Sequence, residues 1–204
     1  EVVTGFGRTG VNFGIDHWGV IPDLMATGKG LSSGYTPIAA TISRDRIYDA
    51  IYETSPSFVH GHTYGGNPLS CATALAVQNY IEKHDLIVRC ARMGTYLQDR
   101  LIRLTDLPMV SEVRGKGLLN GVDLAQDKAT GTPFDPALGV TGRVVTKVFD
   151  KGVLVMPGAP GPIDGMNGDH VAISPPFTVT EEEVDRIVQV LGESIEETAR
   201  ELGG

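Results

Sequence analysis

The sequence predicts an α/β protein divided into two domains, residues 1–88 and residues 89–204. Three observations lead to this prediction. The first 66 residues alternate short apolar runs with clusters of Gly, Ser and Pro, which is typical of the strand-and-loop edge of an α/β sheet. A long helical stretch follows, and the remainder mixes strands with helices. The helical connector at residues 83–90 is therefore the expected domain boundary.

Within the first domain, short apolar segments predict two strands. These cover residues 1–4 and 38–43, each next to a Gly or a Pro. A short helix is expected over residues 45–52. The segment 54–68 is expected to be a loop, and it is unusually rich in aromatic and hydrogen-bonding side chains for its length.

Two long helices are expected around the domain boundary. Asn67 is a natural N-cap and Pro68 suits the first helical position, so the first helix begins there and runs to about Lys83. The second covers about residues 85–104, with apolar side chains on one face: Leu86, Val88, Met93, Leu97, Leu101 and Ile102.

The second domain is expected to be α+β. Strands are predicted at residues 110–113, 118–124, 153–156 and 170–174, a helix at 139–151 and a Gly/Pro loop at 157–168. Thr180 caps a final helix whose acidic first turn suits the positive end of the helix dipole. The buried face of that helix carries Val184, Ile187, Val190, Leu191 and Ile195.

Composition argues against several classes of partner. Seventeen Lys and Arg against 25 Asp and Glu give a formal charge of −8, which disfavours nucleic acid or an anionic membrane. No apolar run reaches the ~18 residues of a membrane span. His60 and His62 have no second cluster of ligands, so no metal site is predicted. Cys71 and Cys90 are expected to be small buried hydrophobes in a reducing, cytoplasmic compartment.

Lys29 is the strongest candidate for chemistry. It lies between Gly28 and Gly30, at the end of an apolar run and before a turn-rich stretch. Glycine lets the backbone approach a ligand closely, and a desolvated lysine there becomes a nucleophilic amine, the chemistry of a Schiff base. A phosphate loop is excluded, because Asp23 stands where Walker A has its first glycine and Gly30 where it has Ser or Thr.

A second glycine motif, at residues 5–10, has the form of a dinucleotide-binding fingerprint. Such a fingerprint opens a helix with apolar periodicity. The residues that follow, 11–22, instead contain two glycines and a proline without that periodicity. A dinucleotide site is therefore not expected here.

Five segments together resemble the class III pyridoxal-phosphate aminotransferases, the ω-transaminase group. They are E-V-V-T-G-F-G-R-T-G at 1–10, P-D-L through G-K-G-L-S-S-G-Y-T-P at 22–37, H-G-H-T-Y-G-G-N-P-L-S-C-A at 60–72, V-R-G-K-G-L at 113–118 and S-P-P-F at 174–177. Their order is that of the C-terminal half of the family's chain. The resemblance implies the C-terminal part of a fold-type-I large domain, then a small α+β domain, and transaminase activity with pyridoxal 5′-phosphate.

The resemblance assigns roles to three residues. Lys29 falls on the lysine that forms the internal aldimine with the cofactor and then moves a proton between substrate carbon and cofactor. Val2 matches the apolar residue on the pyridine ring, and Thr63 the threonine that contacts the cofactor phosphate of the neighbouring subunit in a homodimer. Arg8 and Arg114 lie among glycines and are expected to make structural hydrogen bonds, not a carboxylate clamp.

Two features of the beginning of the chain differ from the family pattern. The family's aspartate that keeps the pyridine nitrogen protonated would precede Glu1, and Glu1 should point to the opposite face of its strand. The chain also starts without Met, so a piece of a longer protein that lacks its N-terminal half is expected. The alternative is a non-catalytic fragment or assembly half that needs this missing N-terminal half.

The resemblance implies an amine donor and a keto-acid acceptor as substrates. Relatives that use ornithine or 4-aminobutyrate carry an arginine three residues before the Pro-Pro pair, where this chain has Ala172. The lack of this carboxylate clamp favours an ω-amino acid or amine as donor and pyruvate as acceptor. A pyridoxal-phosphate aminomutase or decarboxylase of the same superfamily is the other open alternative.

Overall fold

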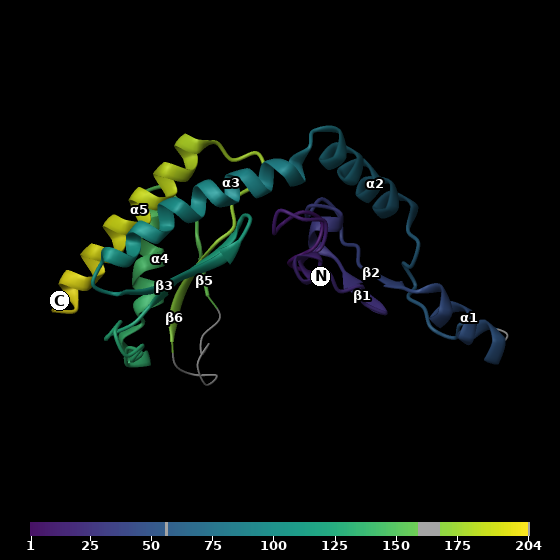
Figure 1. The fold of residues 1–204 in the computed structure, drawn as a ribbon, viewed down its shortest axis with the longest axis horizontal. Helices are drawn as coiled ribbons and strands as arrows, with labels where there is room; N and C mark the ends of the chain where they lie inside the picture. Colours follow the sequence, from purple (N-terminus) through teal and green to yellow (C-terminus); the bar gives the residue numbers. More distant parts are fainter. Residues whose placement is uncertain (56, 159–167, 204) are drawn as a thin grey trace. The chain divides into compact units, whose positions relative to one another are not determined.

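The structure is a computed structural model that describes residues 1–55, 57–158 and 168–203. The chain divides into two compact units, Glu1–Arg89 (unit 1) and Cys90–Gly204 (unit 2), each with its own β-sheet (Figure 1). Helix α3 (Leu86–Leu101) runs through the division between them. Within the described ranges, no helix is both long and apolar enough to cross a membrane.

Unit 1 contains a two-stranded antiparallel sheet of β1 (Leu24–Thr27) and β2 (Ala40–Ser43). Helix α1 (Asp45–Thr54) follows β2 directly. The strand predicted at 38–43 and the helix predicted at 45–52 are therefore confirmed, with shifted ends. None of the residues of β2 or α1 is buried, so this sheet and this helix form no core of their own.

Helix α2 (Pro68–Lys83) begins where the sequence places it. The Asn67 side chain accepts a hydrogen bond from the Ser70 N–H at 3.1 Å, as an N-cap does. Only one face of α2 is buried, the face that carries Ala74 and Ile81. Cys71 lies outside that face and is exposed, so the prediction that it is buried is wrong.

The strand predicted at residues 1–4 is also wrong, because local hydrogen bonds close this segment into a turn. The Gly5 N–H donates to the Glu1 carbonyl at 3.0 Å, and the Thr4 hydroxyl donates to the Glu1 carboxylate at 2.6 Å. The Glu1 nitrogen donates to the Ala26 carbonyl of β1 at 2.9 Å. Alternating apolar residues do not reveal these side-chain and backbone bonds.

Unit 2 is built on a four-stranded antiparallel sheet in the order β3-β4-β6-β5. Its strands are β3 (Val110–Lys116), β4 (Leu119–Leu124), β5 (Met156–Pro157) and β6 (Asp169–Ile173). The predicted strand at 153–156 is mostly wrong, because the Val153 N–H donates to the Val148 carbonyl at 3.1 Å and holds that segment to the preceding helix. The predicted Gly/Pro loop at 157–168 lies largely outside the described residues.

Three helices cover the sheet of unit 2: α3, α4 (Val140–Asp150) and α5 (Glu181–Glu201) (Figure 1). Alternate residues of β4 are buried, which gives the sheet one apolar face. The core includes Cys90, Met93, Leu97, Leu101, Val122, Val144, Val171, Leu191 and Ile195. Thr180 caps α5 as predicted, accepting from the Glu183 N–H while the Glu183 carboxylate accepts from the Thr180 N–H.

Candidate active site

Lys29 stands at the end of a strand. The antiparallel register of β1 and β2 ends with Thr27 opposite Ala40, and the Thr27 hydroxyl donates to the Ala40 carbonyl at 3.0 Å. Gly28 continues the chain in an extended conformation, and Lys29 begins the short 3-10 helix η2 (Lys29–Leu31). The Lys29 backbone has φ of +38°, a region that non-glycine residues adopt only when their surroundings impose it.

Val2 lies beside Gly28. A Cβ atom placed on Gly28 would be 3.7 Å from the Val2 Cγ1. No side chain therefore separates the valine from residues 28–36, here called the lysine loop. Val2 is 42% exposed and presents an apolar surface there. Phe6 lies beside Gly30, since a Cβ on Gly30 would lie 3.3 Å from the Phe6 Cβ. The structure thus brings Val2 next to the segment that carries Lys29.

The Glu1 carboxylate anchors the turn that carries Val2. It accepts hydrogen bonds from the Gly14 N–H at 2.8 Å and the Ile15 N–H at 2.9 Å, in addition to the Thr4 hydroxyl. Partial burial acts to raise the pKa of the Glu1 carboxyl, but these hydrogen bonds outweigh it and lower the pKa below its ordinary value. The carboxylate is therefore occupied by the backbone.

This role of Glu1 is one that sequence reasoning missed. The expectation that Glu1 points to the opposite face of a strand is wrong, because residues 1–9 form turns. Its backbone partners, Gly14 and Ile15, begin the short 3-10 helix η1 (Gly14–Trp18). No local pattern indicates a carboxylate that bonds to N–H groups 13 and 14 residues further along the chain.

Thr63 lies in an exposed turn that ends at the N-cap of α2. The turn is closed by the Gly65 N–H, which donates to the His62 carbonyl at 2.9 Å. Among the described residues, Thr63 makes no hydrogen bond to Lys29 or Val2. No hydrogen bond of the described residues therefore joins Thr63 to the Val2–Lys29 cluster.

Arg114 and Ala172, the two positions of unit 2 considered for a carboxylate clamp, both lie in its sheet. The Arg114 guanidinium donates to both oxygens of Asp123, at 2.8 and 2.7 Å, which raises its pKa and confirms the structural role predicted for it. Ala172 pairs with Gly121 of β4 and with Met156 of β5. Residue 172 itself therefore carries no guanidinium.

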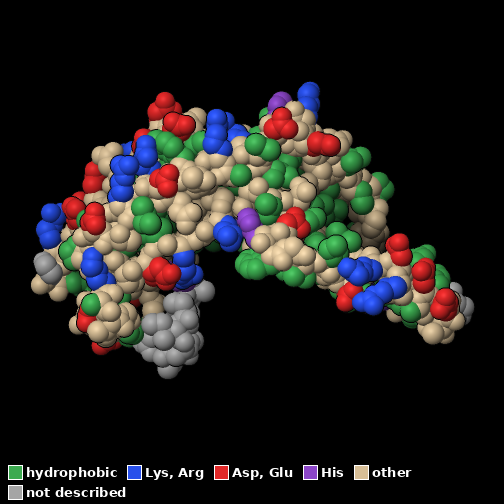
Figure 2. Space-filling view, viewed as in Figure 1, with side chains coloured by type: hydrophobic (Ala, Val, Ile, Leu, Met, Phe, Trp, Pro, Cys, Tyr) green, Lys and Arg blue, Asp and Glu red, His purple; other side chains and the backbone are tan. Residues whose placement is uncertain are grey.

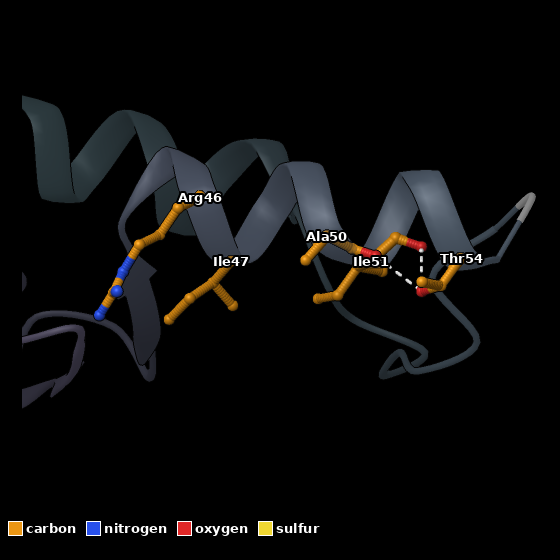
Figure 3. A pocket seen from close by; sticks show the side chains of 5 residues that line it. All are labelled: Arg46, Ile47, Ala50, Ile51 and Thr54. Atoms are coloured by element: carbon orange, nitrogen blue, oxygen red, sulfur yellow. Dashed lines mark hydrogen bonds between the residues drawn. The ribbon is translucent and has the colours of Figure 1, made fainter.

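An open hollow on α1 is a separate feature of unit 1 (Figure 3). Its lining residues are Arg46, Ile47, Ala50, Ile51 and Thr54. The Thr54 hydroxyl is already used within the helix, donating to the Ala50 carbonyl at 2.6 Å. All five residues come from one helix, and none of them is a candidate site residue, so the hollow adds nothing to the Lys29 site.

Comparisons with known proteins identify the family of the chain. The family model for aminotransferase class III matches residues 1–195. An uncharacterized aminotransferase of Bacillus subtilis, YodT, is 37% identical over 203 residues, which cover 99% of this chain and 46% of that protein. A transaminase structure from the marine bacterium Virgibacillus matches with a TM-score of 0.93 and 35% identity, covering 100% of this chain and 45% of its own.

A further solved structure contains the cofactor. It is an amine transaminase from an uncultivated Pseudomonas species in its PLP-bound, internal-aldimine form, with a TM-score of 0.87 and 41% identity over 97% of this chain and 43% of its own. The fold is that of the class III transaminases, α/β enzymes that depend on pyridoxal 5′-phosphate. The chain belongs to the class III aminotransferase family and spans about half the length of the relatives it matches.

The residues at the end of β1 fit this cofactor. An exposed primary amine at Lys29 suits an aldehyde, and the apolar surface of Val2 suits an aromatic ring. A Cβ atom on Gly30 would lie only 3.3 Å from the Phe6 Cβ, so a larger residue beside the lysine would require its neighbours to shift. The described residues do not, however, desolvate Lys29 as the sequence suggested, because its side chain is exposed.

Proposed function

We propose that the polypeptide carrying this chain is a pyridoxal-phosphate-dependent transaminase of the ω-transaminase group. It moves an amino group from an ω-amino acid or amine to a keto acid such as pyruvate. The observation that carries the proposal is the position of Lys29, on a strained backbone at the end of β1 with the Val2 side chain beside Gly28. Family membership gives this lysine its chemical context.

Three side chains have separate tasks in this proposal. When bound, pyridoxal 5′-phosphate supplies an aldehyde and an electron-withdrawing ring that stabilises negative charge at the substrate carbon. The Lys29 Nζ would hold the aldehyde covalently and would move the proton at the substrate carbon. Val2 packs against one face of the ring. The Thr63 hydroxyl donates to the phosphate held by the neighbouring subunit of a homodimer.

The exposed apolar surface of unit 1 supports the proposal that partners cover it. Apolar side chains gather at the surface around α2 (Figure 2), where Leu69, Leu75 and Tyr80 are 75%, 62% and 54% exposed. Single exposed hydrophobes are common, but a gathering of large ones is typical of an interface. In the proposed protein, an N-terminal half and a second copy of the chain cover these surfaces and desolvate Lys29.

Two further proposals concern the substrate and the location. Ala172 provides no cationic clamp in its position on β6, which favours donors without an α-carboxylate to be held there. The chain has only two cysteines in 204 residues, which is not a disulfide framework and fits a reducing, cytoplasmic compartment.

Product analysis with the complete polypeptide tests the proposal. The protein is incubated with pyridoxal 5′-phosphate, pyruvate and a panel of amine donors with and without an α-carboxylate. We expect alanine to form, with ω-amino acids and simple amines as better donors than α-amino acids. Loss of carbon dioxide from the donor, or migration of its amino group within one molecule, would instead identify a decarboxylase or an aminomutase and overturn the proposal.

A further inference from the structure

One side chain outside the candidate site is bonded directly to the loop of Lys29. The Gln78 Nε2 on α2 donates to the Gly30 carbonyl at 3.1 Å and to the Leu31 carbonyl at 2.9 Å. Both acceptors are carbonyl oxygens of η2, the turn that begins at Lys29. Because carbonyls only accept, the NH₂ end of the amide must face them, which fixes the orientation of the Gln78 amide.

The loop needs such an external restraint. Lys29 has a positive φ of +38° and Ser33 one of +50°, so two non-glycine residues hold conformations that cost free energy. Within the loop, the Ser32 hydroxyl donates to the Thr36 carbonyl at 2.6 Å, and Ser32 is buried. That bond closes the loop downstream of the lysine. Gln78 instead joins the residues immediately after Lys29 to a long helix.

The contact belongs to a continuous face of α2. Ser70, Ala74 and Gln78 follow one another at four-residue intervals, so they lie on one side of the helix. Ala74 is buried between the other two, and the Ser70 hydroxyl lies 2.9 Å from the Thr36 hydroxyl. The first turn of α2 is thus bonded to the Thr36 end of the lysine loop, and the middle of α2 is bonded to the Gly30–Leu31 end.

We propose that Gln78 is a positioning residue for Lys29. Its amide fixes the two carbonyls that follow the lysine, and so sets the direction in which the Lys29 side chain leaves the strained backbone. The same helix begins beside the turn of Thr63, so it also fixes the spacing between that turn and the lysine loop. This inference rests on the proposed function of Lys29, because positioning matters only if the amine captures an aldehyde.

The experiment compares variants of the complete polypeptide. Gln78→Met keeps the length of the side chain and removes the N–H donor. Gln78→Lys keeps an N–H donor, from which the two carbonyls can accept hydrogen bonds. Gln189→Met is the matched control, because the Gln189 amide donates to Glu193 on the exposed surface of α5. The melting temperature of every variant is recorded, so that a general loss of stability is recognised.

The first readout needs no cofactor. Hydrogen exchange of the segment 28–36 is expected to be about tenfold faster in Gln78→Met, the effect of losing one or two hydrogen bonds, and unchanged in Gln189→Met. The second readout is the rate at which added pyridoxal 5′-phosphate becomes fixed on Lys29 by borohydride, measured by peptide mass. We expect this rate to fall about tenfold in Gln78→Met and to recover to within about threefold of wild type in Gln78→Lys.

The outcomes separate the two proposals. If wild-type protein captures pyridoxal 5′-phosphate at Lys29 but Gln78→Met exchanges and reacts as wild type does, the role of Gln78 is refuted while the proposed function stands. The role of Gln78 is also refuted if Gln78→Met and Gln189→Met slow capture equally, or if Gln78→Met lowers the melting temperature without faster local exchange. If wild-type protein captures nothing at Lys29, the proposed function itself is wrong, and the positioning role falls with it.

Discussion

The two units of the chain differ in what stabilises each of them internally. In unit 2, one apolar core draws its residues from between Cys90 and Leu202, most of them on α3, α4, α5 and the sheet. In unit 1, the buried apolar side chains of the described residues are Ala74, Ile81 and Leu86, while many large ones are exposed. Unit 2 is therefore a domain with its own core, whereas unit 1 exposes the surfaces that a core would bury.

The candidate site lies in the unit without the core. Its geometry depends on hydrogen bonds: Glu1 to the turn at Gly14, Thr27 to Ala40, and Gln78 to the carbonyls after Lys29. Such bonds hold backbone direction well, but each contributes only about 1 kcal/mol net. Under the proposed function, unit 1 provides the chemistry and is covered by partners, while unit 2 is stabilised by the packing of its own core.

The largest effect should come from removing the amine. Lys29→Ala is expected to lower transamination by about 10³-fold or more, the scale of losing a catalytic nucleophile. Lys83→Ala, which removes an amine from the last turn of α2, is the matched control and should retain activity. The initial rate of alanine formation from pyruvate measures both, and equal rates for the two variants would remove Lys29 from the reaction.

The core of unit 2 provides the next effect. Leu191→Ala removes a fully buried side chain of α5 and should lower the free energy of unfolding of unit 2 by about 2–5 kcal/mol. Leu75→Ala, on the exposed face of α2, should change that free energy by no more than about 0.5 kcal/mol. Hydrogen exchange of unit 2 segments in increasing denaturant measures both values. Similar losses would contradict a core confined to unit 2.

Glu1 gives unit 1 a local dependence on pH. Because its pKa is lower in the folded chain, its contribution is fully present above the ordinary value of 4.5 and is lost as the pH falls through the folded value. In wild-type protein, exchange at Gly14 and Ile15, corrected for the intrinsic effect of pH, should therefore accelerate in that acidic range. Glu1→Gln should remove this dependence, and an identical pH profile for the two proteins would exclude the carboxylate as its source.

The smallest effect concerns the cap of α5. Thr180→Ala removes the acceptor for the Glu183 N–H and should lower the stability of unit 2 by about 1 kcal/mol. Thr146→Ala, at an exposed position inside α4, is the control and should cost less. Thermal unfolding followed by circular dichroism measures the difference. A Thr180→Ala protein as stable as its control would mean that water replaces the cap.

The sequence predicts best what neighbouring residues determine. Asn67 with Pro68 and Thr180 with Glu183 are capping pairs within four positions, and both helices begin where these pairs place them. The predicted helical apolar face is confirmed at Leu86, Met93, Leu97 and Leu101, because its spacing follows the period of the helix. Val88 and Ile102 are exposed, so the prediction that they lie on this face is wrong.

The errors arise where distant residues decide the structure. The apolar pattern predicts a strand at Glu1. This prediction is wrong because the Glu1 carboxylate accepts hydrogen bonds from Gly14 and Ile15, which lie in a different turn. The helical pattern predicts a buried Cys71, but the face of α2 that carries it is exposed. Gln78 gives no sign of its role in the sequence, since its acceptors lie 47 and 48 residues before it. Lys29 itself is identified by its glycines and its family motif.

The most direct test of the account is the site of covalent capture. The complete polypeptide is mixed with pyridoxal 5′-phosphate, reduced with borohydride, digested and mapped by mass spectrometry. The account predicts that the reduced pyridoxyl group is found on Lys29, in the peptide that follows β1, and that Lys29→Ala protein carries none. A stable adduct on a different lysine, or an unmodified Lys29 in a protein that transaminates, would contradict it.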